Sequence, residues 1–272
     1  KHFDLAVAYL EGGSTYFVHD YVDAEKKAAF IHVDYERAGY SRSLDKDCYR
    51  EFDRIFTVSD EVKQSFLNVY PECSGRTYVF HNLINQEEIR RKAELPGGFE
   101  DSYDGKRILT VGRLTAQKAY EFSIDAMKLL KDHGVKARWY VLGEGELREK
   151  LQFKINKLGL KDDFILMGAR ENPFPYYKEC DLYVHASRFE GKSIAIQEAQ
   201  TLGCTLVVSD CSGNREQVEP GVDGMMCRLD AKEICDTVEA LLKDEEKCRK
   251  LGKKAAEKSF LEDKDVLKPF DF

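Results

Sequence analysis

The sequence predicts an α/β fold built on parallel, doubly wound sheets. Short apolar runs, such as Ile108–Val111, alternate with segments that carry apolar residues at helical spacing. Such alternation requires crossover connections and therefore parallel strands. A stretch rich in turn formers, residues 94–106, interrupts the alternation and is expected to link two domains.

The first half, residues 1–93, offers about four strands. We expect strands at 4–8, 27–33, 54–58 and 77–80, and helices at 20–27, toward the end of 35–53, and after Ser59. Ser59 is a typical N-cap residue before an amphipathic segment. Because the chain starts at Lys1 and this half is short of strands, we expect an incomplete Rossmann-like domain whose first strands are missing.

The second half, residues 107–272, offers six strands and reads as a complete Rossmann-like domain. The strands are expected at 108–111, 138–142, 164–167, 181–185, 205–209 and 225–228. Helices fill the intervals, and three of them should stop at Gly134, Gly159 and Gly203. Asp230 should cap the next helix, and a final lysine-rich helix is expected over 245–258.

Bulk composition excludes several classes of protein. The 272 residues carry a net charge of −7, which disfavours general nucleic-acid binding. No apolar run reaches the length that spans a membrane. The eight cysteines form no C-x-x-C pair and have no histidine at zinc spacing, as expected of free thiols in a reducing cytoplasm. Two D-x-D matches, 45–47 and 263–265, lie in highly charged surroundings, so no metal site is expected.

Two carboxylates, Glu190 and Glu198, flank the start of one predicted helix. A strand ends at His185, a tight loop follows, and the helix ends near Gly203. Free N–H groups at a helix start bind anions. Glu198 lies among apolar residues and needs a partner there, which a ribose diol could provide. This layout suits a nucleotide sugar, although such glutamates can also simply face water.

Arg113 and Lys118 follow the first strand of the second half, where the carboxyl ends of parallel strands bind ligands. Two cations at that place can neutralise a diphosphate. Two solvated charges beside a helix start are the alternative. Gly143-Glu-Gly145 is half of a dinucleotide fingerprint, and since the rest is absent, it favours a tight turn and argues against an NAD site.

Two histidines end predicted strands. His32 could bond a sugar hydroxyl or shuttle a proton, or it could be a satisfied structural residue. His185 stands in a buried strand, where a structural role is favoured.

Taken together and in order, these motifs resemble the donor-binding half of retaining glycosyltransferases of family 4, which have the GT-B fold. The matching pieces are Val111-Gly-Arg-Leu114 with Lys118, Leu142-Gly-Glu-Gly145, Met167-Gly168, the E-x7-E signature from Glu190 to Glu198, Ser209-Asp-Cys-Ser-Gly213 and Gly221-Val-Asp-Gly224. The match covers about residues 107–260. The first half matches the acceptor-side domain more loosely, through Ile31–Tyr35, Thr57–Ser59 and His81-Asn82. Bacterial capsular and exopolysaccharide enzymes are the most similar.

The resemblance implies a role for each matching residue. Arg113 and Lys118 would hold the diphosphate, Glu190 would contact sugar hydroxyls, and Glu198 would bind the ribose. Residues near Gly168 and Arg170 would line the base. Backbone N–H groups in the stretch Gly191, Lys192, Ser193 and Ile194 would meet the phosphate, and His32 would touch the transferred sugar. Glu190, His32, Arg113 and Lys118 form the implied catalytic set, with no metal and no cofactor.

The implied function is retaining transfer of a sugar from a nucleotide-diphosphate sugar to a saccharide or lipid-linked acceptor in polysaccharide biosynthesis. The resemblance places such a protein in the cytoplasm and allows peripheral contact with the inner face of the membrane. The chain departs from the family at Ala119, where glycine is usual, and in lacking the glycine-rich loop of the first strands. The expectation for a truncated form is donor binding without transfer. The alternatives are a GT-B nucleotide-sugar epimerase, a binding-only relative, and, less favoured, a nucleotide-dependent oxidoreductase.

Overall fold

The computed structural model describes residues 1–260, which fall into two compact units. One unit comprises Lys1–Leu83 together with the short segment Phe189–Ser193. The other comprises Ile84–Arg188 and Ile194–Phe260. The second D-x-D match, at 263–265, lies outside the described residues.

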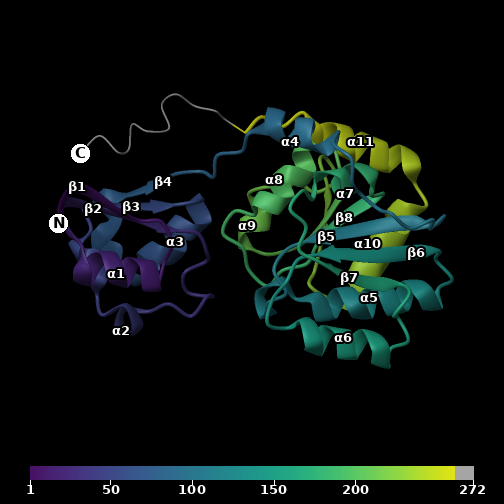
Figure 1. The fold of residues 1–272 in the computed structure, drawn as a ribbon, viewed down its shortest axis with the longest axis horizontal. Coiled ribbons are helices and arrows are strands. Elements are labelled where there is room, and N and C mark those ends of the chain that lie inside the picture. The colour runs from purple at the N-terminus through teal and green to yellow at the C-terminus, as the bar shows by residue number, and fades with distance from the viewer. Residues whose placement is uncertain (261–272) are drawn as a thin grey trace. The chain divides into compact units, whose positions relative to one another are not determined.

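The first unit is a four-stranded parallel sheet with helices packed on one face (Figure 1). The strands, in spatial order, are β1 (His2–Ala8), β2 (Asp23–Ile31), β3 (Arg54–Thr57) and β4 (Thr77–Val79). The helices are α1 (Gly13–Tyr21), α2 (Arg42–Asp45) and α3 (Asp60–Val69), with 3-10 turns at Cys48–Glu51 and Pro71–Arg76. Ser59 caps α3 as predicted, because its Oγ accepts a hydrogen bond of 3.2 Å from the Val62 N–H.

One predicted element of this unit is wrong. The segment 20–27 is not a helix, since α1 ends at Tyr21 and β2 begins at Asp23. The polar start of β2 pairs in parallel with β1 from the register His2↔Asp23 onward. Pairing with a neighbouring strand thus overrides the helical preference of the local residues.

The second unit is a six-stranded parallel sheet covered by helices on both faces (Figure 1). Its strands are β5 (Lys106–Val111), β6 (Ala137–Leu142), β7 (Phe164–Gly168), β8 (Leu182–His185), β9 (Leu206–Ser209) and β10 (Met225–Cys227). Its helices are α4 (Gln86–Ala93), α5 (Tyr120–Asp132), α6 (Arg148–Lys157), α7 (Phe174–Glu179), α8 (Ile194–Thr201), α9 (Ser212–Arg215), α10 (Ala231–Leu242) and α11 (Glu245–Ala256). Asp230 caps α10 as predicted, accepting from the N–H groups of Lys232 and Glu233.

The strand order fixes where a ligand can bind in this unit. The order is β10-β9-β8-β5-β6-β7, so the connections leave β5 in one direction and reach β8 in the other. Doubly wound sheets bind ligands at the carboxyl ends of the strands on either side of such a switch point. The loops after β5 and β8 are therefore the expected place for a site. The two-sheet α/β architecture predicted from the sequence is confirmed.

The predicted linker is a structured part of the second unit. The units divide between Leu83 and Ile84, before the predicted boundary at residue 93, and an unpredicted helix, α4, follows the division. Within 94–106, the Phe99 ring lies 4.4 Å from the Tyr140 ring, and the Asp101 carboxylate accepts hydrogen bonds from Arg107, Arg138 and Tyr140. These two anchors fix a segment whose composition resembles a linker.

Strand β1 carries exposed apolar side chains. Phe3, Leu5 and Val7 are 48%, 39% and 39% exposed.

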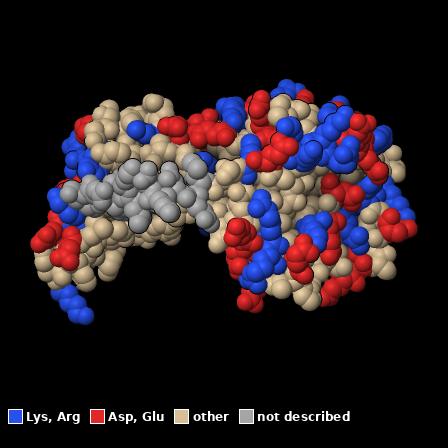
Figure 2. All heavy atoms as spheres, turned by 90° about the horizontal axis from the view of Figure 1, so that it is seen from above, with Lys and Arg blue, Asp and Glu red and all other residues tan. Residues whose placement is uncertain are grey.

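Charges of both signs are interleaved on one face of the molecule. Figure 2 shows Lys and Arg intermixed with Asp and Glu on the face that it presents, without a broad patch of one sign. Within residues 1–260, no helix has the length and apolar character needed to cross a membrane.

Candidate functional site

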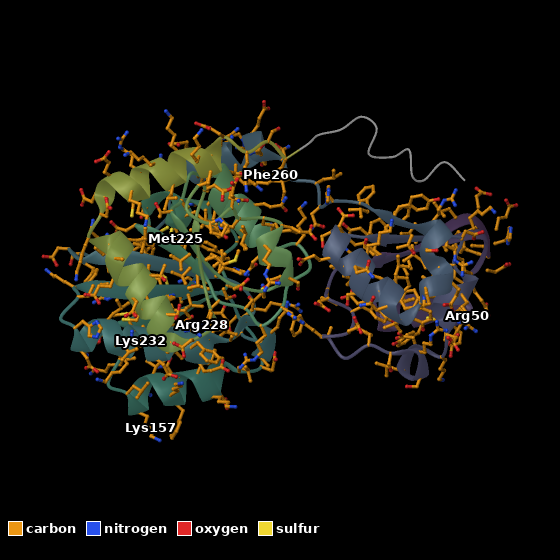
Figure 3. All side chains as sticks on the ribbon, turned by 180° about the vertical axis from the view of Figure 1, so that it is seen from behind. Arg50, Lys157, Met225, Arg228, Lys232 and Phe260 are labelled. Atoms are coloured by element: carbon orange, nitrogen blue, oxygen red, sulfur yellow. The ribbon has the colours of Figure 1, made fainter. Side chains whose placement is uncertain are left out.

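The loop after β5 presents two cations at the switch point. Arg113 is exposed and Lys118 half-buried, and a short 3-10 turn, Ala116–Lys118, separates β5 from α5. Within residues 1–260, no side chain forms a hydrogen bond or ion pair with the Arg113 guanidinium. Arg228 and Lys232, labelled in Figure 3, differ because each pairs with a carboxylate on α10, Glu233 and Asp236 respectively.

Lys118 is oriented by a chain of hydrogen bonds from β8. Its Nζ lies 3.4 Å from His185 Nε2, and His185 Nδ1 lies 3.1 Å from Tyr183 Oη. Tyr183 Oη in turn donates to the Val111 carbonyl at 3.4 Å. These contacts are consistent with a neutral imidazole protonated on Nδ1, which leaves Nε2 to accept from the ammonium. His185 is thus one member of a chain of contacts that ends at Lys118.

Ala119, which follows Lys118, has a left-handed backbone with φ of +47°. This conformation costs an alanine about 1 kcal/mol. The chain therefore keeps at this position the backbone shape that a glycine would adopt freely.

The Gly143-Glu-Gly145 turn supports the Arg113 loop from behind. A Cβ at Gly143 would lie 2.0 Å from the Gly112 carbonyl oxygen, and a Cβ at Gly145 would lie 2.5 Å from the Leu114 carbonyl oxygen. The Leu114 N–H donates to the Glu144 carbonyl at 2.9 Å. The two glycines therefore allow the backbone of this turn to pack directly against the backbone around Arg113. The glycine pattern serves packing within this unit.

Glu198 is largely buried on α8, and Tyr177 Oη donates a hydrogen bond of 3.1 Å to its Oε2. No cation among the described residues pairs with this carboxylate. Burial raises the pKa of Glu198 to about 7, although the Tyr177 hydrogen bond acts to lower it. A buried carboxylate with a single phenol partner keeps capacity to accept further hydrogen bonds.

Gly168 and Arg170 stand at the end of β7, beside a cavity of about 470 Å³. The cavity is lined by Gly98, Phe99, Glu100, Asp101, Arg138, Tyr140, Ile165, Met167, Arg170 and Tyr176. Arg170 Nε donates to Tyr176 Oη at 3.2 Å. A cavity with aromatic walls and a guanidinium can take a flat, polar ring.

The segment that contains Glu190 belongs to the first unit. Glu190 and Ser193 are buried, Gly191 is buried and Lys192 half-buried. A Cβ at Gly191 would lie 1.9 Å from the His32 carbonyl oxygen, so only glycine fits there. Asn82 Nδ2 donates to the Lys192 carbonyl at 3.1 Å. The structure thus brings Glu190–Ser193 and His32 together, while Ile194, 48% exposed, begins α8 in the second unit.

His32, just after β2, has a carboxylate neighbour that sequence reasoning missed. The His32 N–H donates to Glu11 Oε2 at 2.9 Å, and the imidazole Nδ1 lies 3.7 Å from the same oxygen. The sequence signal was a glutamate followed by Gly12-Gly13 directly after a strand. Tyr177 was also missed, because it lies 21 residues before the glutamate that it contacts.

Among the residues that the structure describes, one group of side chains could hold a metal by residue type. His133, Cys235 and Glu239 bring their ligand atoms within 4.8 Å of one another. However, His133 Nδ1 and Glu239 Oε2 are already hydrogen-bonded at 2.6 Å, and burial raises the pKa of the Cys235 thiol to about 11. As they stand, these groups satisfy one another at the surface of α5 and α10.

Comparison with known proteins identifies relatives. Residues 87–258 match the family described as glycosyl transferases group 1. An N-acetylgalactosaminyltransferase of Campylobacter jejuni that acts on a diphospho-undecaprenol-linked saccharide is 30% identical over 210 residues, which cover 76% of this chain and 55% of that protein. An uncharacterised glycosyltransferase of Methanocaldococcus jannaschii is 30% identical over 179 residues, which cover 63% of this chain and 43% of its own length. The chain spans about half the length of these curated relatives.

Solved structures show the same fold. A Staphylococcus aureus TarM variant, bound to UDP and saccharide ligands, aligns with a TM-score of 0.77 at 16% identity, covering 98% of this chain and 54% of that one. Anabaena HepE, bound to UDP and glucose, aligns with a TM-score of 0.72 at 18% identity, covering 85% and 66%. These likenesses confirm the predicted GT-B type of architecture. The match over residues 87–258, more than half of the sequence, assigns this chain to the glycosyl transferases group 1 family.

Proposed function

We propose that this chain binds a nucleotide-diphosphate sugar and that the protein containing it transfers the sugar, with retention of configuration, to a saccharide or lipid-linked acceptor in polysaccharide biosynthesis. The observation that carries the proposal is the Arg113 guanidinium. It is exposed at the switch point of a doubly wound sheet, without a protein partner among residues 1–260. A diphosphate is the natural counter-charge for such a cation.

The remaining residues are assigned around that diphosphate. Lys118 would share its charge, Glu198 would accept both ribose hydroxyl protons, and the cavity beside Arg170 would take the base. Glu190 would contact hydroxyls of the transferred sugar, and the N–H groups of Lys192, Ser193 and Ile194 would meet a phosphate, as helix N-termini do.

We further propose that the reaction needs no metal and no cofactor. Arg113, Lys118 and backbone N–H groups can together stabilise the charge that develops on the leaving diphosphate. An epimerase or a binding-only relative would use the same donor residues, but the named relatives, which are transferases, do not favour either alternative. A cytoplasmic location at the inner face of a membrane is part of the same proposal and rests on the lipid-linked saccharide named for the Campylobacter relative.

The first test of the proposal is whether the chain binds a nucleotide sugar. Calorimetry with UDP-, GDP- and ADP-sugars and NAD(P) should give binding to one class of nucleotide sugar, with UDP the first candidate because TarM and HepE were solved with it. Binding of NAD(P) alone would overturn the proposal. With the longer protein, NMR of the product should show the donor's anomeric configuration, and EDTA should leave the rate unchanged. Donor epimerisation without an acceptor would instead support the epimerase.

Glu198 predicts a pH-dependent nucleotide affinity. The ionised carboxylate accepts two ribose hydroxyls, and hydrogen bonds to a charged group contribute about 1.5–3 kcal/mol. Since the pKa in the free protein is about 7, affinity should fall as pH decreases from 8 to 6. Glu198→Gln should bind roughly 10- to 100-fold more weakly at pH 8 and show little pH dependence. The exposed Glu149→Gln serves as the control in calorimetric titrations at each pH.

The same carboxylate should make stability depend on pH with the opposite sign. Its pKa is higher in the folded chain, about 7, than the ordinary value of 4.5, so the folded state binds more protons between those values. Stability therefore falls as pH rises through this window. Glu198→Gln should gain on the order of 1–3 kcal/mol over wild type at pH 8 and little at pH 5. Equal effects at both pH values in urea titrations would rule out the buried carboxylate as the cause.

A further inference from the structure

The carboxylate of Glu11 is built into the first unit beside His32. Glu11 lies between β1 and α1, directly before Gly12, the N-cap residue of α1. Its side chain is only 11% exposed. A carboxylate placed next to a helix N-terminus is stabilised by the helix dipole. Glu11 is therefore a buried anion with a fixed position.

Glu11 is tied to His32 through the backbone. The His32 N–H donates to Glu11 Oε2 at 2.9 Å. Burial acts to raise the pKa of Glu11, but hydrogen bonding with His32 outweighs it, so the pKa lies below its ordinary value. The carboxylate is thus ionised at neutral pH and faces the residue that follows β2.

Two aromatic rings flank the imidazole of His32, whereas its Nδ1 atom has no hydrogen bond within residues 1–260. Its ring centroid lies 5.1 Å from that of Tyr9 and 5.9 Å from that of Phe30, with which it stacks at 21°. Nδ1 is buried and has no hydrogen-bond partner among the described residues. Glu11 Oε2 lies 3.7 Å away, somewhat longer than a hydrogen bond. If this distance shortened by a few tenths of an ångström, Glu11 Oε2 would accept a hydrogen bond from His32 Nδ1–H.

We propose that Glu11 is a positioning residue that keeps the proton of His32 on Nδ1 and so presents Nε2 as a hydrogen-bond acceptor for a hydroxyl of the sugar substrate. This inference rests on the proposed function. A carboxylate or carbonyl bonded to one ring nitrogen commonly sets the tautomer of a functional histidine. Tyr9, 60% exposed beside the imidazole, offers an apolar ring to the same sugar.

The first readout is spectroscopic and does not need activity. Long-range ¹H–¹⁵N spectra of histidine-labelled chain, with the His32 signals assigned by their loss in His32→Gln, report which ring nitrogen carries the proton. We expect a protonated Nδ1 and a bare Nε2 at pH 8 in wild type. Glu11→Gln can still accept the backbone N–H through its amide oxygen, but it should give a mixture of tautomers. Glu25→Gln, at an exposed position on β2, is the matched control. A predominant Nε2–H tautomer in wild type, or the same tautomer in wild type and Glu11→Gln, overturns the proposal.

The second readout is kinetic and uses the longer protein. Glu11→Gln should lower kcat by roughly 10- to 100-fold, the range typical when the partner that orients an imidazole is removed. The donor KM should change less than kcat, because Arg113, Lys118 and Glu198, which are proposed to bind the nucleotide, are untouched. An unchanged kcat, or a loss confined to KM, contradicts the role of Glu11. Should the longer protein transfer no sugar at all, the proposed function fails, and the tautomer measurement alone decides the position of the proton.

Discussion

Alanine at Arg113 or at Lys118 is expected to lower the transfer rate by roughly 100- to 1,000-fold, the loss typical when one preorganised donor to a developing negative charge is removed. Both cations lie at the carboxyl end of β5, where the diphosphate leaving group is proposed to bind. Charge on that group grows as the glycosidic bond breaks, so kcat should fall more than donor affinity. Initial rates at saturating and limiting donor separate the two effects.

Matched controls exist on the same unit. Arg228→Ala and Lys232→Ala remove surface cations that already pair with Glu233 and Asp236 on α10, and should leave the rate unchanged. Lys118→Arg should not restore full activity, because the planar guanidinium differs in size and donor geometry from the ammonium that lies 3.4 Å from His185 Nε2. If Arg113→Ala and Lys118→Ala retain rates within about threefold of wild type, the diphosphate binds elsewhere.

The fold of the second unit could be predicted because its signals are local and strong. Ile108–Val111 and Trp139–Leu142 are short runs of mostly apolar residues, as expected of strands buried on both faces. Gly134, Gly159 and Gly203, with φ near +70°, end helices where the sequence placed the ends. Asp230 and Ser59 cap helices through side-chain oxygens that bond nearby N–H groups. Each of these features needs only a few neighbouring residues.

The errors arise where distant contacts decide the local structure. The start of β2 follows the register of β1 and not its own residues. The segment 94–106 looks like a linker because it is rich in glycine and acidic residues. It is held in place because the Phe99 ring packs against the Tyr140 ring and because Asp101 accepts hydrogen bonds from two arginines, one on β5 and one on β6. Contacts between residues that are far apart in the sequence cannot be predicted from the spacing of residues along the chain.

The candidate site shows the same limit. The residues that contact a ligand in the proposal stand in short motifs, so Arg113, Glu190 and Glu198 could be chosen from the sequence. The residues that contact these site residues from elsewhere in the chain belong to no such motif. Tyr177 donates a hydrogen bond to Glu198 from another helix, and Glu11, in the preceding βα loop, accepts one from the His32 N–H. Supporting side chains are selected by geometry, which becomes visible only once the chain is folded.

Gly143→Ala is expected to damage both the stability of the second unit and the binding of nucleotide. Gly143 has φ of +152°, and a Cβ there would lie 2.0 Å from the Gly112 carbonyl oxygen. Both the backbone conformation and the contact are incompatible with alanine, so a loss on the order of 3 kcal/mol is expected. In a domain of this size, that loss lowers Tm by about 6–12 °C.

The clash should also move the loop that presents Arg113. Gly112 directly precedes Arg113, and the Gly112 N–H donates to the Leu142 carbonyl at 3.0 Å, next to the substituted residue. Gly134→Ala is the matched control, because Gly134 also has a positive φ, +74°, but no atom lies within 4 Å of its added Cβ. It should cost only about 1 kcal/mol of backbone strain and leave nucleotide affinity intact. Similar Tm values for the two variants in calorimetry, or full nucleotide affinity in Gly143→Ala, would show that the turn does not support the site.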